Sequence, residues 1–160
     1  MRIAVAVFLA ILLLMSTPSP ILAKGKTVKI TISGGDLKRP IEITDPNILV
    51  KFRVWVGPGT SSNDREGLIV DWSPGPVGEV PPGLPKYKVS FHTDPNDQLV
   101  YEVFYAVSRG ADHGYVYVPG ESDEYYGLNV RTIFRGVEGK WFRAWSAWEQ
   151  VARPLIDKVG

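Results

Sequence analysis

Short segments in which apolar and polar residues alternate, separated by turns rich in glycine and proline, constrain most strongly what this chain can fold into. Residues 27–33 alternate strictly and stop at two glycines, and residues 86–92 alternate again and stop at the turn-forming residues 93–97. A period of two places successive side chains on opposite faces of a β-strand. The 13 prolines and 16 glycines interrupt longer ladders and helices. We therefore expect a fold built mainly from short antiparallel strands.

The strongest hairpin signal joins residues 86–92 to residues 99–107 across the turn at 93–97. In the first of these strands the alternation predicts that Tyr87, Val89 and Phe91 point inward, and that Lys86, Lys88, Ser90 and His92 point outward. Strands are also expected at 40–44, 53–56, 67–72 and 115–118, and residues 129–135 are expected to pair with 140–145. The prolines and glycines of residues 73–85 predict a long ordered loop.

Two segments have the signals of helices. Asp45 followed by Pro46 is typical of an N-cap and the first helical position, so one or two helical turns are expected at 47–52. Ser146 and Glu149 have the spacing of a capping box, which predicts a helix from Ser146 onward. One apolar stripe then recurs at steps of three and four, with Pro154 away from it: Trp148, Val151, Ala152, Leu155, Ile156 and Val159. The expected fold class is mainly β (α+β), with an antiparallel sheet or sandwich-like core and one C-terminal amphipathic helix.

The first 23 residues have the form of an export signal. Arg2 precedes an uncharged apolar run at residues 3–15, two prolines follow, and the segment ends on the small residue Ala23. A membrane-spanning helix needs about 20 apolar residues, so cleavage after Ala23 is favoured over the alternative of a retained membrane tether. We expect a signal peptide at 1–23 and a single exported β-rich domain at 24–160, located in the periplasm or outside the cell.

Composition limits the possible partners of such a domain. The chain has no cysteine, so it cannot rely on disulfides and must be stabilised by its core. The chain has 18 Lys and Arg against 17 Asp and Glu, and Arg2 lies in the leader, so the charges of the remainder balance. Nucleic acid and anionic membranes require clustered positive charge and are not expected partners. No stretch after the leader is long and apolar enough to span a membrane.

No group of residues specifies a cofactor, a metal or a catalytic nucleophile. The two histidines, His92 and His113, are far apart in the sequence, and only His113 has an adjacent carboxylate, Asp112, that could orient it. The acidic residues 121–124 could hold a hard cation, although such a run is more often a solvated loop. Candidate binding residues are the loop carboxylates, the loop histidine and two neighbouring tyrosines: Asp112, His113, Glu121, Asp123, Glu124, Tyr125 and Tyr126.

Aromatic residues are the last indication of a binding surface. Tyr125 and Tyr126 lie in the acidic loop, and Trp141, Arg143 and Trp145 share one face of a predicted strand that could be half exposed. Aromatic side chains stack on sugars and anchor protein interfaces, although most of them simply fill a core. Sequence therefore favours the tyrosine pair as the first place to look for a ligand.

Three stretches with aromatic and glycine residues of a structural kind resemble a group of uncharacterised exported bacterial proteins: residues 115–120, 125–130 and 136–144. Residues 30–35 together with 40–45 resemble the same group. The resemblance implies a setting in a bacterial envelope and transfers no activity. We expect a non-enzymatic domain that binds a protein or polysaccharide partner in the envelope or extracellular space. The alternative is a hydrolase of wall or extracellular polymers that uses loop carboxylates and His113.

Overall fold

A computed structural model describes residues 25–62 and 66–160, and in these residues it contains one eight-stranded antiparallel sheet and three helices. The strand order is β2-β1-β5-β6-β7-β8-β4-β3. The elements are β1 (Thr27–Gly34), β2 (Ile41–Ile43), α2 (Pro46–Leu49), β3 (Glu66–Gly67), β4 (Val70–Asp71), β5 (Lys86–Thr93), β6 (Gln98–Ala106), β7 (Tyr115–Val118), α3 (Tyr126–Thr132), β8 (Lys140–Ala144) and α4 (Ser146–Val159). The predicted leader at 1–23 lies outside the described residues.

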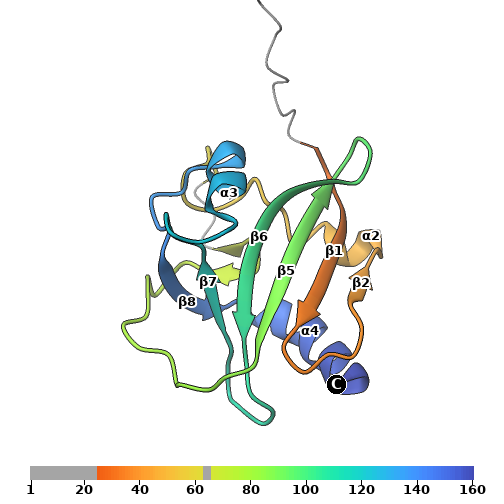
Figure 1. Cartoon of the computed structure of the whole chain (residues 1–160). Coiled ribbons are helices and arrows are strands. Elements are labelled where there is room, and N and C mark those ends of the chain that lie inside the picture. Colours follow the sequence, from red (N-terminus) through yellow and green to blue (C-terminus); the bar gives the residue numbers. More distant parts are fainter. Residues whose placement is uncertain (1–24, 63–65) are drawn as a thin grey trace, which may run out of the picture.

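The predicted fold class is confirmed, with one sheet rather than two. Figure 1 shows that the sheet is curled, with α4 behind it and α3 in front of its upper end. We call the side covered by α4 the inner face and the opposite side the outer face. Since the inner face and α4 enclose the core, no second sheet is needed to bury it. Among the described residues, no helix is long and apolar enough to cross a membrane.

The period of two correctly predicted the central hairpin. β5 pairs with β6 along its whole length, and Tyr87, Val89 and Phe91 are buried in the core as expected. Ser90, which was expected to face solvent, is buried as well. Its hydroxyl donates to Glu102 Oε1 at 2.5 Å, since the register places the two residues opposite each other on the outer face, where α3 covers them.

Both helices begin where the sequence predicted. Only α2 has the predicted N-cap. Asp45 is the N-cap of α2 and accepts a 2.8 Å hydrogen bond from the amide of Asn47. In α4 the N-cap is Trp145, which makes no side-chain capping bond, and Ser146 is the first helical residue. The predicted capping box is therefore wrong, because Glu149 contacts a loop instead, as described below. The apolar stripe is confirmed, with Trp148, Ala152 and Ile156 fully buried and Pro154 exposed.

The strand predicted at 53–56 is wrong, since these residues form turns. A buried arginine explains the difference: the Arg135 guanidinium donates to the carbonyls of Val54 and Val56, so these groups are satisfied without a neighbouring strand. The single strand predicted at 67–72 is also wrong. It is instead the hairpin β3–β4, in which Leu68 has a φ of 59°.

The strand predicted at 129–135 is the third error, because residues 126–132 form α3. β7 pairs with β6 only from Phe104 to Ala106, so the backbone of Glu102 has no strand partner on that side. Asn129 takes the strand's place: its Oδ1 accepts from the amide of Glu102 at 2.9 Å, and its Nδ2 donates to the Glu102 carbonyl at 2.7 Å. The β-branched residues of this segment favoured a strand, but the short helix satisfies the exposed edge of β6.

Candidate binding surface

A row of aromatic side chains crosses the outer face of the sheet. The register places Lys88 of β5 opposite Phe104 of β6, Phe104 opposite Tyr117 of β7, and Tyr117 opposite Trp141 of β8. All four side chains are half-buried. We call Phe104, Tyr117 and Trp141 the aromatic row. Its residues come from three strands, and cross-strand pairing alone brings them together.

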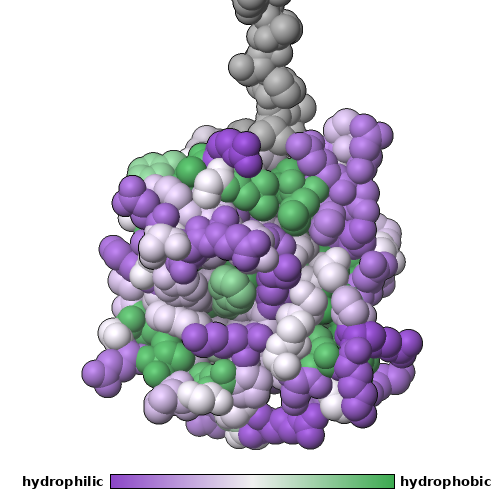
Figure 2. Space-filling view, viewed as in Figure 1, coloured by the Kyte–Doolittle hydropathy of each residue, from purple (hydrophilic) through white to green (hydrophobic). Residues whose placement is uncertain are grey.

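The aromatic row forms the wall of a surface depression. The depression has a volume of about 350 Å³ and is lined by the row together with Lys86 and Asp123. The rings of Tyr117 and Trp141 lie 5.0 Å apart, centroid to centroid, and are tilted by 39°. Figure 2 views the molecule from this side: hydrophilic side chains surround a hydrophobic residue at the centre, and further hydrophobic residues lie toward the edges. The site therefore combines ring faces with a polar rim.

Two lysines border the row, and they differ in their partners. Lys88 Nζ lies 3.8 Å from Glu102 Oε1, donates to the Tyr125 hydroxyl at 3.2 Å, and lies 5.1 Å from the centre of the Tyr125 ring. The hydrogen bond with Tyr125 raises the pKa of the Lys88 ammonium group. Lys86 is exposed, and its Nζ lies 5.6 Å from the centroid of the Trp141 ring, with no ion pair among the described residues. Lys86 is thus a cation of this surface that a ligand could engage.

Asp123 is held at the edge of the depression by the turn that follows β7. Its Oδ2 accepts from the Tyr117 hydroxyl at 2.9 Å and from the amide of Gly120 at 2.7 Å. Burial, together with this hydrogen bond, raises the pKa of the Tyr117 hydroxyl, so the hydroxyl stays protonated at neutral pH. Position 120 cannot hold a side chain, because a Cβ added to Gly120 would lie only 2.8 Å from the Gly139 Cα. The carboxylate therefore has a defined position beside the aromatic row.

A buried carboxylate, Glu102, lies next to Phe104 on the outer face, where α3 covers it. Glu102 is only 2% exposed, and its Oε2 has no hydrogen-bond partner within the part of the chain that the structure describes. Its other oxygen is satisfied by Ser90, and Lys88 supplies a positive charge nearby. The rings of Tyr125 and Phe104 lie 6.1 Å apart, centroid to centroid, so Tyr125 packs at the edge of the aromatic row. Glu102 itself is buried and offers a ligand almost no surface.

The sequence-predicted site residues fall at two ends of β7. Asp123 and Tyr125 border the aromatic row, and the charge of Glu124 acts on the nearby Lys88. Glu121 is exposed, and Tyr126 is half-buried at the start of α3. These five residues follow β7. They share one end of the sheet, but only Asp123 lines the depression.

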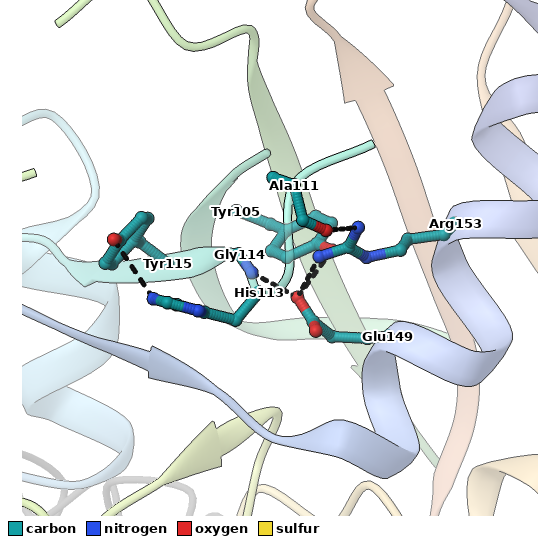
Figure 3. Close-up of polar contacts among 7 residues, drawn as sticks. All are labelled: Tyr105, Ala111, His113, Gly114, Tyr115, Glu149 and Arg153. Atoms are coloured by element: carbon teal, nitrogen blue, oxygen red, sulfur yellow. Dashed lines mark hydrogen bonds and ion pairs between the residues drawn. The ribbon is translucent and has the colours of Figure 1, made fainter. Parts of the chain in front are cut away.

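Asp112 and His113 precede β7 and so lie at its other end. Figure 3 shows His113 beside Tyr115, the first residue of β7. His113 Nε2 forms a 3.1 Å hydrogen bond with the Tyr115 hydroxyl, and Asp112 is exposed. The structure does not bring His113 together with Glu121, Asp123 or Glu124, since the length of β7 separates them.

Figure 3 also shows why Glu149 does not cap α4. Its Oε1 accepts hydrogen bonds from the amide of Gly114, from the Tyr105 hydroxyl at 3.2 Å and from Arg153 at 3.1 Å. Arg153 also donates to the carbonyl of Ala111. The pair on α4 thus fastens the loop between β6 and β7 to the helix. We interpret this cluster as structural, because its hydrogen bonds join α4 to β6 and to the loop that follows it, while Arg153 Nε is buried without a partner among the described residues.

Sequence reasoning missed Lys86, Lys88, Phe104 and Tyr117 as parts of a site. Alternation correctly placed the two lysines on the outer face, but the neighbouring strands were needed to show what lies beside them. Trp141 is on the predicted half-exposed face. Trp145, expected on the same face, lies beyond the end of β8 and packs against Phe52 with ring centroids 5.6 Å apart.

The described residues contain no group of three or more His, Cys, Asp or Glu side chains that could hold a metal ion. Comparison of the chain with models of protein families, with curated proteins and with solved structures finds no match. The resemblance to exported bacterial proteins therefore stays a prediction.

Proposed function

We propose that this chain is an exported binding domain without catalytic activity, and that it binds a protein or polymer partner in the cell envelope or extracellular space. The observation that carries the proposal is the aromatic row on the outer face, where half-buried rings line a depression with a polar rim. Ligand sites are typically concave surfaces in which apolar rings supply contact area and a few polar groups supply orientation. The export leader at 1–23 supports the cellular setting.

The hydrolase alternative has less support. It requires His113 to act with loop carboxylates, whereas His113 bonds to Tyr115 and lies at the far end of β7 from Glu121 and Glu124. General acid and base groups must reach the same substrate atoms within hydrogen-bond distance or through one water. Binding is therefore the function that the geometry favours.

Two measurements test the proposal. Cell fractionation followed by N-terminal sequencing should find the protein outside the cytoplasm, beginning at Lys24. The purified protein should be retained on envelope material of its own cells, and Trp141→Ala should reduce retention at least tenfold. Phe134→Ala is the matched control, because Phe134 is an exposed aromatic residue outside the row, with 63% of its surface accessible.

Retention that is equal for the wild type and Trp141→Ala would refute the role of the aromatic row. An unprocessed product confined to the cytosol would refute the proposed setting. Thermal melting of each variant should be recorded alongside, so that loss of binding is not confused with loss of fold. Trp141 is on the outer face and outside the buried core, so its replacement should leave the fold intact.

A further inference from the structure

We infer that the ligand of the aromatic row is an acidic polysaccharide, with a sugar ring stacked on Trp141 and Tyr117 and a sugar carboxylate bound by Lys86. This inference rests on the proposed function and names the chemical class of the partner.

The ring faces of the row fit the shape of a sugar. A pyranose ring presents flat patches of C–H groups and carries its hydroxyls around the rim, so it can stack on an aromatic face while its hydroxyls bond to groups at the side. Trp141 and Tyr117 supply two rings 5.0 Å apart, and Asp123 supplies a carboxylate beside them that already accepts from Tyr117. A volume of about 350 Å³ lies at the small end of the range for ligand sites, which begins at about 300 Å³.

The charges of the outer face favour an anionic sugar over a neutral one. Lys86 has no carboxylate partner within the described residues and rests over the ring of Trp141. Arg143 lies on the same face, because it pairs with Tyr115 as Trp141 pairs with Tyr117, and it is exposed. Asp123, the carboxylate that lines the depression, has one oxygen already engaged by two donors. The lining of the depression thus contains one cation, Lys86, and one carboxylate, Asp123, and Arg143 adds a second cation on the same face without an ion pair among the described residues.

Lys86 can change partner when such a ligand arrives. A surface cation held over a ring is weakly bound, whereas a charge-assisted hydrogen bond to a carboxylate is stronger. Transfer of the ammonium group from Trp141 to the ligand would also uncover the ring face for stacking. Binding should therefore change the fluorescence of Trp141.

Other classes of partner fit this surface less well. A protein interface of standard size buries about 800 Å² on each partner around an apolar centre, whereas on this face bands of hydrophilic side chains separate the hydrophobic residues from one another (Figure 2). Nucleic acid requires a dense array of cations, and the charges of the chain outside the leader balance.

The test compares acidic polymers with matched polymers that lack the charge. Polygalacturonate, alginate and hyaluronate each serve as a probe, and the methyl ester of each serves as its neutral control. Affinity is measured by calorimetry and by tryptophan fluorescence at low ionic strength. We expect at least one acidic polymer to bind, with affinity at least tenfold lower after esterification and lower again as salt is added.

Variants separate the contributions of charge and ring. Lys86→Gln should weaken binding of the acidic polymer about tenfold and leave binding of its ester unchanged, whereas Trp141→Ala should abolish both and remove the fluorescence change. Lys158→Gln, a lysine exposed on α4, is the matched charge control and should bind as the wild type does. No binding to any of the three polymers, or equal binding of acid and ester, would overturn the inference.

The inferred polysaccharide ligand can be wrong while the proposed binding function is right. Treatment of the envelope material distinguishes these two cases. If the partner is a polysaccharide, periodate oxidation should abolish retention of the wild type and protease should not. If retention depends on Trp141 but is sensitive to protease and resistant to periodate, the partner is a protein. The inference is then wrong while the proposed binding function stands. Retention independent of Trp141 refutes the proposed function itself.

Discussion

Replacement of Arg135 should destabilise the protein by a large part of its folding free energy. Arg135 is only 4% exposed, and its guanidinium donates to the carbonyls of Val54, Val56 and Pro58 and to the Tyr101 hydroxyl. In Arg135→Met the stem remains but these acceptors lose their donors. Three of the four bonds are buried, and each buried acceptor left unpaired costs about 1–3 kcal/mol. We expect a loss of at least about 3 kcal/mol.

Two further variants make this prediction specific. Arg135→Lys keeps the charge but has a single ammonium group, which cannot reproduce the planar fork that reaches several acceptors at once. Its loss should be intermediate, at about 2 kcal/mol. Arg39→Met removes an exposed arginine from the turn before β2 and should change stability by less than about 0.5 kcal/mol. Urea unfolding at pH 7, followed by circular dichroism, measures all three.

The reasoning would be refuted if Arg135→Met lost less than about 1 kcal/mol, or no more than the Arg39 control. In that case packing would hold the turns at 53–58. Only the aliphatic stem of Arg135, and not its guanidinium group, would contribute to stability. A loss in Arg135→Lys equal to that in Arg135→Met would show that the charge contributes nothing without the fork geometry.

Three other predictions follow from buried polar groups. Asn129→Ala leaves the amide and carbonyl of Glu102 unpaired, and should cost about 2–4 kcal/mol and speed hydrogen exchange of the Glu102 amide. Trp148 is fully buried and its indole N–H has no partner in the described part of the chain, so Trp148→Ala should cost about 3–5 kcal/mol but Trp148→Phe clearly less. Burial, aided by the nearby Glu149, raises the pKa of the Tyr105 hydroxyl above its usual value of 10.0. Above pH 10 the unfolded tyrosine ionises while the folded one does not, so stability should fall as pH rises, by about 1.4 kcal/mol per pH unit from this group. Tyr105→Phe, compared with the wild type in urea unfolding from pH 8 to 11, should lack this contribution.

Each of these predictions has a contrary outcome. A Glu102 amide that stays protected in Asn129→Ala would mean that another group completes the edge of β6. Equal losses for the two Trp148 variants would show that the indole ring, not its unpaired N–H, decides the energy. Parallel curves of stability against pH for the wild type and Tyr105→Phe would contradict the raised pKa, since the difference between them should shrink above pH 10.

Most of the regular strands could be predicted from local pattern. Alternation placed β1 and β5 correctly, an apolar run after a turn placed β6, and a stripe at helical spacing placed α4 and its buried face. Local pattern was less informative where an element is held by a distant side chain. The turns near Val54 depend on Arg135, which lies far along the chain, and α3 replaces a strand because Asn129 satisfies the backbone of Glu102.

The candidate site was predicted only in part for the same reason. Asp123 and Tyr125 were recognised from the acidic loop, and Trp141 from its half-exposed face. Lys86 and Phe104 carried no signal of function in the sequence, and nothing singled out Tyr117 from the other aromatic residues, because each is an ordinary outward residue of its own strand. Their proximity depends on which strands are neighbours and in what register.

The sequence alone predicted the export leader. It also predicted the β-rich fold class and the amphipathic terminal helix, which the structure confirms. These properties depend on neighbours within a few positions, since the direction of a side chain repeats every two residues in a strand and every 3.6 in a helix. The tertiary structure alone decided that β6, β7 and β8 lie side by side. That arrangement places Phe104, Tyr117 and Trp141 in one row. Pairing between distant strands depends on the summed burial and hydrogen bonding of the whole sheet, which no local stretch of residues encodes.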